Sequence, residues 1–247
     1  MQSEEANLIA IHQAYSPDEL LERFERGDGT GHYLLILYSI VIGLNAKTII
    51  DIGTGQTTGA LRAAAKRTGG IVYSYDQDYR RKQCLLPYQD QQWRLSLAPS
   101  STSLPEAPSP IDFVMHDGAH DYVNVKCDLE LLLPKMRQFG IICVHDTQQP
   151  ELYRDMLAAI SDATRNLKVS LTNLPFNCGL AIIRVEESMH PPITPAFGNL
   201  PQGQSDTLPV PFASGAQQTL AVPMHRRLLV PIKIKVGHLL RQAGLKQ

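Results

Sequence analysis

Two short segments of the sequence combine carboxylates with imidazoles in an order that could bind a metal ion. One reads Asp117-Gly-Ala-His120 and the other His145-Asp146, and each follows an apolar run typical of a buried strand. If the two strands are neighbours, Asp117 and Asp146 emerge at the same edge of a sheet. Two like charges close together favour a cation between them, and carboxylate oxygens suit Mg²⁺ or Mn²⁺. We therefore expect Asp117 and Asp146, with His145 as a third candidate, to bind a divalent metal.

Such a metal would act as a Lewis acid on a substrate hydroxyl, and a base must then accept the proton. His120 follows Asp117 closely, where a helix is expected to begin, and an imidazole has an ordinary pKa near neutrality. We predict that His120 is this general base. His116 lies inside the apolar run and is expected in the core. Three further acids are predicted on a solvated helix face or in its N-terminal turn: Asp121, Asp128 and Glu130.

A glycine-containing turn, Asp51-Ile-Gly53-Thr54-Gly55, follows the first expected strand. Ligands of open α/β sheets bind at the carboxyl ends of strands, where the strand order reverses. A dinucleotide loop needs a third glycine where this chain has Thr58, and a phosphate loop needs a Gly-Lys pair that is absent here. Asp51, with no Lys or Arg from 51 to 61, disfavours pyrophosphate and favours a cationic ligand such as S-adenosylmethionine.

Three further positions complete the expected cofactor site. Asp76 ends the second expected strand, where a carboxylate can accept hydrogen bonds from both hydroxyls of a ribose. Ser100 follows the third strand and is expected at the adenine edge, with an ordinary turn as the alternative. Asp117 ends a strand beside the glycine turn and is expected to contact the cofactor as well. The alternative interpretation of this pattern is that Asp51 and Asp76 only cap helices.

Alternating β-rich and helical segments must position these residues. Strands are expected at 47–52, 71–75, 93–97, 111–116 and 140–145, and helices near 57–67, 78–86, 120–133 and 150–164. The last runs, 168–171 and 179–185, have no helix between them and should pair antiparallel at one edge. The predicted fold is α/β, a Rossmann-like doubly wound sheet of seven strands, mostly parallel with an antiparallel C-terminal hairpin.

Over about residues 45 to 185, the glycine turn and Asp76 resemble class I S-adenosylmethionine-dependent methyltransferases. The segments that end in His120 and in Asp146 are similar to metal-dependent O-methyltransferases that modify macrolide sugars and to cephalosporin-hydroxylase-like proteins. The resemblance implies that Asp117 and Asp146 bind metal and that His120 is the base. Those families have a carboxylate where this chain has His145, and an imidazole there shifts the preference toward Mn²⁺, Fe²⁺ or Zn²⁺.

The resemblance implies methyl transfer from S-adenosylmethionine to a hydroxyl of a small molecule, a sugar, polyol or phenol of specialised metabolism. One alternative is a metal-free N- or O-methyltransferase, in which Asp117 and Asp146 only bond loop amides. Another is a non-catalytic cofactor-binding scaffold with a docking tail. Aminopropyl transfer, which uses a related cofactor on this fold, is a remote further option.

Changes in composition along the sequence indicate how the chain is divided into domains. Residues 1–45 are expected to form a helical cap, 46–185 the methyltransferase domain, and 186–247 a Pro-rich strap with a basic amphipathic tail. The tail carries six Lys and Arg and no acid after Asp206, and we expect it to join copies of the chain into a homo-oligomer, with membrane docking as the less favoured alternative.

Charge and hydropathy exclude several classes of protein. The chain has 247 residues, 23 Lys and Arg against 24 Asp and Glu, and 43% hydrophobic residues, which excludes a disordered chain and a nucleic-acid-binding polycation. The longest apolar run, 34–44, is too short to span a membrane, and residues 1–6 do not resemble a signal peptide. The four cysteines show no paired spacing. We therefore expect a cytoplasmic enzyme.

Overall fold

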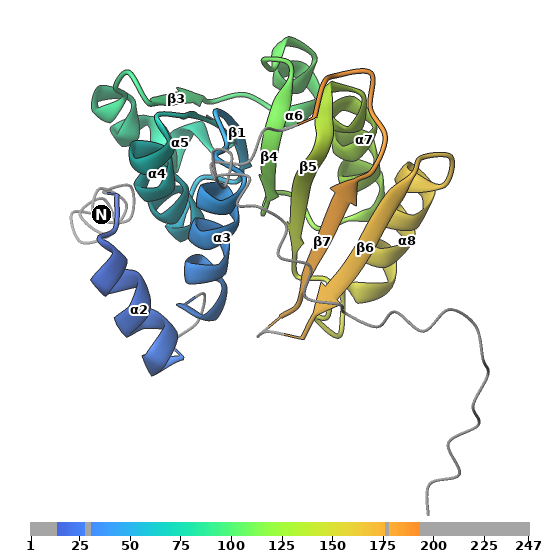
Figure 1. Cartoon of the computed structure of the whole chain (residues 1–247), viewed down its shortest axis with the longest axis horizontal. Coiled ribbons are helices and arrows are strands. Elements are labelled where there is room, and N and C mark those ends of the chain that lie inside the picture. Colours follow the sequence, from blue (N-terminus) through green and yellow to red (C-terminus); the bar gives the residue numbers. More distant parts are fainter. Residues whose placement is uncertain (1–13, 28–30, 176–177, 193–247) are drawn as a thin grey trace, which may run out of the picture. The chain divides into compact units, whose positions relative to one another are not determined.

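The computed structural model describes residues 14–27, 31–175 and 178–192, and its centre is a sheet of seven strands (Figure 1). The strand order is β3-β2-β1-β4-β5-β7-β6. The pairs from β3 to β5 are parallel, whereas β7 runs antiparallel to both β5 and β6. The strands are β1 (Thr48–Ile52), β2 (Ile71–Tyr75), β3 (Trp93–Ser96), β4 (Ile111–His116), β5 (Met136–His145), β6 (Val169–Leu174) and β7 (Leu180–Val185). The predicted sheet and its antiparallel edge hairpin are confirmed.

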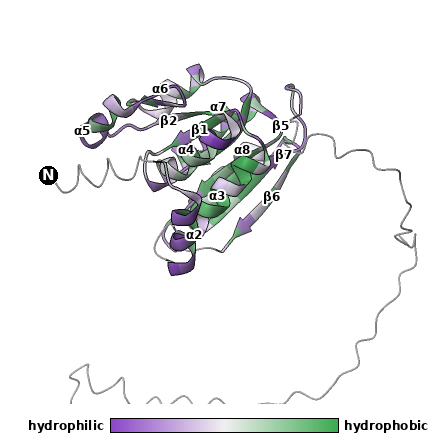
Figure 2. Cartoon of the chain, turned by 60° about the vertical axis from the view of Figure 1, so that its left-hand side comes forward, coloured by the Kyte–Doolittle hydropathy of each residue, from purple (hydrophilic) through white to green (hydrophobic). Residues whose placement is uncertain are grey.

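Helices cover both faces of the sheet. The α-helices are α2 (Pro17–Arg26), α3 (Gly31–Gly43), α4 (Gln56–Thr68), α5 (Tyr79–Lys82), α6 (Ser100–Ser103), α7 (Tyr122–Leu132) and α8 (Tyr153–Thr164). Three short 3-10 helices are η1 (Gln83–Tyr88), η2 (Leu104–Glu106) and η3 (Leu133–Lys135). Side chains alternate between the faces of a strand, so Ile49 packs toward α3 and α4 while Ile50 packs toward α7 and α8. Figure 2 shows the hydrophobic residues along the central strands, between the two helical layers.

Local signals account for the ends of several helices. Ser16 caps α2: its hydroxyl accepts from the Glu19 amide at 3.1 Å, and the Glu19 carboxylate accepts from the Ser16 amide at 2.7 Å. The helix expected at 78–86 is instead a single α-turn, α5, followed by η1. Pro87 lies inside η1, and a proline disfavours α-helical geometry in the residue before it, which explains the change.

The prediction that Asp128 lies on a solvated helix face is wrong. Its side chain is buried, and its Oδ2 lies 3.1 Å from Nε2 of the equally buried His116. Asp128 shares the inward face of α7 with Val125, Leu129 and Leu132, at the spacing of one helical stripe. A buried carboxylate needs a partner, and His116 supplies it. The positions of Asp121 as the cap of α7 and of His116 in the core are confirmed.

Much of the expected strap and all of the expected tail lie outside the described residues. Of the strap, the structure describes residues 186–192, where His190 forms an isolated β-bridge with Arg137. Oligomerisation through the tail therefore stays a prediction. In the described part of the chain, no helix is long and apolar enough to cross a membrane.

Candidate functional site

Three loops meet at the carboxyl edge of the sheet, after β1, β4 and β5. The register pairs Ile52 with His116 and His116 with Val144, so the residues that follow these strands lie side by side. The Asp117 amide also donates to the Ile52 carbonyl at 2.8 Å. The topology thus brings the glycine turn and the two acid-imidazole segments to one place, at the position where ligands of open α/β sheets bind.

The first glycine of the turn is required by a backbone contact. Gly53 has φ +89°, and a Cβ at this position would lie 2.0 Å from the Asp117 carbonyl oxygen. The Gly53 amide donates to the Tyr75 carbonyl at 2.9 Å. Gly55 is different, because its φ of −166° suits any residue and a Cβ there would meet nothing within 4 Å. Gly53 therefore serves the packing of the loops, and Gly55 leaves the space above the turn open.

Asp51 lies beneath the glycine turn and is not among the described residues that line the cavity above it. Its Oδ2 accepts from Thr58 Oγ1 and from Ser74 Oγ, both at 2.7 Å, whereas Oδ1 has no partner among the described residues. Thr58 Oγ1 in turn accepts from the Gly55 amide at 2.9 Å. Burial raises the pKa of Asp51 to about 7. We expected Asp51 to contact a ligand directly. In the structure its side chain instead supports the turn from below.

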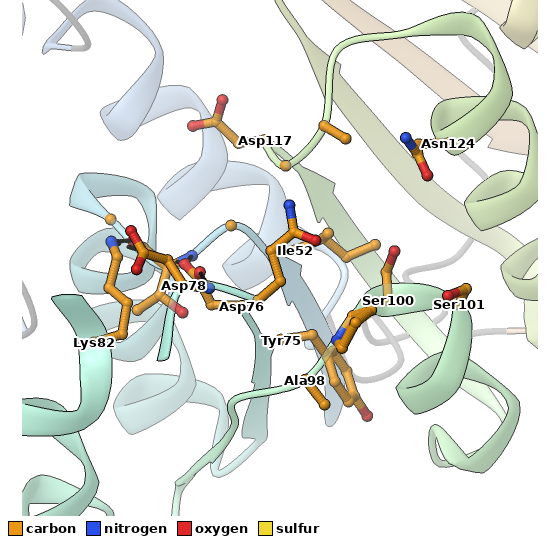
Figure 3. Close-up of a pocket in the computed structure, with 17 residues that line it drawn as sticks. Ile52, Tyr75, Asp76, Asp78, Lys82, Ala98, Ser100, Ser101, Asp117 and Asn124 are labelled. Carbon is orange, nitrogen blue, oxygen red and sulfur yellow. Dashed lines mark hydrogen bonds and ion pairs between the residues drawn. The ribbon is translucent and has the colours of Figure 1, made fainter. Parts of the chain in front are cut away.

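A cavity of about 400 Å³ opens above the turn (Figure 3). Six of the seven residues expected to bind cofactor line it: Gly53, Thr54, Gly55, Asp76, Ser100 and Asp117. In Figure 3, Asp76 and Lys82 lie on one side of the cavity and Ser100 on the other. Asp76 and Ser100 thus both border this cavity, and their contacts with ribose and adenine stay predictions.

Asp76 connects the turn to the second strand. Its Oδ2 accepts from the Thr54 amide at 2.9 Å and its Oδ1 from the Asp78 amide at 2.8 Å. Lys82 lies 3.8 Å from Asp76 Oδ2 and donates to the Thr54 carbonyl. The sequence from 51 to 61 carries no cation, and Lys82 reaches the turn from further along the chain. Its place on the helix after the Asp76 strand is the signal that could have found it.

The acid-imidazole segments form one cluster of four side chains. Donor atoms of Asp117, His120, His145 and Asp146 all lie within 4.8 Å of one another. His145 Nδ1 is 3.0 Å from Asp117 Oδ1 and 3.1 Å from Asp146 Oδ1, and His120 Nε2 is 3.0 Å from Asp146 Oδ2. Two carboxylates and two imidazoles at these separations are a donor set suited to a divalent ion.

The cluster also shifts the protonation of its own members. Burial would raise the pKa of Asp117, but hydrogen bonds from His120 and His145 and their positive charges hold it below its ordinary value. The hydrogen bond to Asp117 raises the pKa of His120 against the opposing effect of burial, and the charge of Asp146 adds to the rise. Asp146 has φ +60°, a conformation that aspartate tolerates better than most residues.

Two residues at the cluster had no signal in the sequence. Tyr33 is fully buried on α3, its ring centroid lies 4.6 Å from that of His145, and its hydroxyl has no partner among the described residues. Burial, with the charges of Asp117 and Asp146, raises the pKa of Tyr33, so its hydroxyl stays protonated. Cys178 lies beside Asp146, and burial followed by that carboxylate raises the pKa of its thiol. In the sequence, Tyr33 looks like any residue on the apolar face of a helix and Cys178 like any residue in a loop, so neither could be predicted to lie at the site.

Comparison with known proteins identifies one family that matches part of the chain. The family described as a methyltransferase domain matches residues 50–147, which include the glycine turn and all four cluster residues. No curated protein matches the chain.

Solved structures match the fold over most of the chain. An S-adenosylhomocysteine-bound methyltransferase, PaMTH1 of Podospora anserina, has a TM-score of 0.57 at 14% identity, covering 70% of this chain and 91% of that one. A putative caffeoyl-CoA O-methyltransferase from Staphylococcus aureus has a TM-score of 0.55 at 17% identity, covering 73% and 98%. CalS11, a TDP-rhamnose 3'-O-methyltransferase of calicheamicin biosynthesis, has a TM-score of 0.51 at 14% identity, covering 74% and 93%. At these identities the likeness establishes the fold.

The contact at Gly53 predicts a contrast between two alanine variants. Gly53→Ala should lower the free energy of unfolding by about 2–4 kcal/mol, because the new Cβ overlaps the Asp117 carbonyl and φ is positive. Gly55→Ala should change it by less than about 0.5 kcal/mol. Urea unfolding followed by circular dichroism measures both, and equal effects would contradict the assignment.

The raised pKa of Asp51 predicts a pH dependence of stability. The pKa is about 7 in the folded chain and has an ordinary value of 3.8, so the folded state keeps a proton that the unfolded chain releases between these values. The stability that this group contributes is full below about pH 4 and is lost as pH rises through about 7. Asp51→Asn cannot ionise, so its free energy of unfolding should rise relative to wild type between pH 4 and pH 8.

Urea titrations at several pH values measure this difference. Asp155→Asn, at an exposed position on α8, is the control and should follow the wild-type profile. Parallel profiles for Asp51→Asn and wild type would show that Asp51 is ionised throughout this range.

Proposed function

We propose that this chain, a class I S-adenosylmethionine-dependent methyltransferase by its fold and by the family of residues 50–147, methylates a hydroxyl oxygen of a small molecule. The observation that carries the proposal is the position of Asp117. This residue lines the cavity above the glycine turn and also belongs to the acid-imidazole cluster. A cofactor bound in the cavity would therefore lie next to the groups that activate the acceptor.

The cofactor would lie along the carboxyl ends of β1 to β3. Asp76 offers its carboxylate to the ribose hydroxyls, as a strand-end acid does in related nucleotide sites. Ser100 would contact the adenine edge, and Thr54 and Gly55 the methionine part; all three line the cavity, which supports these roles. Asp51 acts from below, by holding the turn through Thr58.

The reaction needs a base and an acceptor oxygen beside the sulfonium methyl group. The oxygen forms a bond to the methyl carbon while the carbon–sulfur bond breaks and its electron pair stays on sulfur, which leaves S-adenosylhomocysteine. The proton of the hydroxyl passes to His120, whose Nε2 faces Asp146 in the cluster. Asp117 and Asp146 stabilise the positive imidazolium that results.

Asp117, His145 and Asp146 are the residues that would hold a divalent ion. Their donor atoms already converge at 3.0 to 3.1 Å, which fits such an ion. A divalent ion bound there would lower the pKa of the acceptor hydroxyl by its charge.

A metal-free methyltransferase is the second candidate, and one observation favours it. Each imidazole of the cluster lies about 3.0 Å from a carboxylate, so the four side chains compensate one another's charges. In that case the pair of His120 and Asp146 acts alone as the base, as a histidine oriented by a carboxylate does in other enzymes.

The acceptor would be a sugar, polyol or phenol. Two of the fold neighbours are a putative caffeoyl-CoA O-methyltransferase and a TDP-rhamnose 3'-O-methyltransferase. Tyr33 packs beside the cluster with a buried, neutral hydroxyl.

The cofactor assignment predicts the effect of Asp76→Ala. Removing the carboxylate should weaken binding of S-adenosylhomocysteine about tenfold or more, because a bidentate contact to a charged group contributes about 1.5–3 kcal/mol. Isothermal titration calorimetry measures this affinity, with Asp155→Ala as a surface control. Unchanged affinity in Asp76→Ala would remove Asp76 from the cofactor site.

The base assignment predicts the effect of His120→Ala on catalysis. Turnover of S-adenosylmethionine with a library of sugars, polyols and phenols should fall by about 10²–10⁴-fold, with little change in cofactor affinity. His190→Ala, a histidine on the segment after β7, is the matched control and should keep wild-type turnover. Wild-type turnover in His120→Ala would reduce this histidine to a structural role, and binding of the cofactor without turnover of any acceptor would favour a non-catalytic scaffold.

A further inference from the structure

We infer that the cluster selects a borderline transition-metal ion, such as Zn²⁺ or Mn²⁺, over Mg²⁺, and that His145 is the residue that sets this selectivity. The inference rests on the metal-assisted form of the proposed function. It concerns the affinity of the site for metal ions alone, so it can be tested without a substrate.

The donor atoms of the cluster are already spaced as ligands of one ion. His145 Nδ1 lies 3.0 Å from Asp117 Oδ1 and 3.1 Å from Asp146 Oδ1. An ion with bonds of about 2.1 Å to ligands at right angles separates neighbouring donor atoms by about 3.0 Å. The imidazole nitrogen is therefore at ligand spacing from an oxygen of each carboxylate, and the donor atoms of the whole cluster lie within 4.8 Å of one another.

The His145 ring is held in place by its surroundings. It is the last residue of β5, its side chain is buried, and the Tyr33 ring packs against it at 4.6 Å with a 44° tilt. Its Nε2 is buried and has no hydrogen-bond partner among the described residues. Backbone position and packing thus fix the ring with Nδ1 toward both carboxylates. A fixed imidazole cannot turn away to make room for a water ligand.

Divalent ions differ in the donors that they prefer. Mg²⁺ prefers oxygen donors and keeps several waters, whereas imidazole suits Zn²⁺ and the other borderline ions. A neutral imidazole ligand carries no negative charge. The site therefore attracts a hard ion less strongly than a site with three carboxylates would.

The experiment measures binding of Zn²⁺, Mn²⁺ and Mg²⁺ alone to the metal-stripped full-length chain, in chelator-buffered titrations. Wild type should bind Zn²⁺ and Mn²⁺ at least about 100-fold more tightly than Mg²⁺. His145→Glu should reduce this ratio about tenfold or more, chiefly by tighter Mg²⁺ binding. His145→Gln should weaken Zn²⁺ and Mn²⁺ binding about tenfold or more without a gain for Mg²⁺. His190→Gln controls for surface histidines and should behave as wild type.

Three results would overturn the inference: equal affinities for Mg²⁺ and the transition metals in wild type, an unchanged ratio in His145→Glu, and no binding of any of the three ions. Circular dichroism establishes that each variant is folded, and His145→Gln decides the role of His145 if His145→Glu does not fold. Titration of the same samples with S-adenosylhomocysteine tests cofactor binding separately from metal binding. Cofactor binding without metal binding would refute the metal site and leave the methyltransferase assignment intact.

Discussion

The contact between the backbone at Gly53 and the carbonyl of Asp117 is the constraint on which the rest of the site depends. The two loops touch so closely that no side chain fits between them. Because of this contact, the turn after β1 and the acid after β4 share one wall of the cavity. If the loops stood further apart, the cofactor cavity and the acid-imidazole cluster would be separate sites. Because Asp117 belongs to both, a cofactor in the cavity and an acceptor at the cluster would lie side by side, as methyl transfer requires.

Buried polar groups support this edge of the sheet from below. The Trp93 indole donates to Ser74, Ser74 and Thr58 donate to Asp51, and Thr58 accepts from the turn. These hydrogen bonds rigidify the turn, although they bury a carboxylate whose Oδ1 has no partner among the described residues. The pair of His116 and Asp128 plays the same part beneath the loop after β4. None of these network side chains is among the described residues that line the cavity.

Much of this arrangement could be predicted from the sequence, because it depends on periodicity and on strand ends. The strands, their antiparallel hairpin and the meeting of Asp117 with Asp146 all follow from short apolar runs with acids after them. What could not be predicted depends on contacts between distant segments. Nothing near Tyr33 indicates that its ring packs on His145, and Lys82 reaches the turn from a helix well beyond it in the sequence. The burial of Asp128 was visible in its helical spacing, but its charge suggested the opposite.

The packing of Tyr33 against His145 has a consequence for the order in which the site forms during folding. The glycine turn and Asp76 come from neighbouring segments, so their contacts close only short loops. Tyr33 lies on α3 and His145 at the end of β5, and a contact between segments so far apart in the sequence forms slowly. The contacts between the glycine turn and Asp76 can therefore form before Tyr33 packs against His145. The His145 side of the acid-imidazole cluster is therefore covered only after α3 has packed on the end of β5.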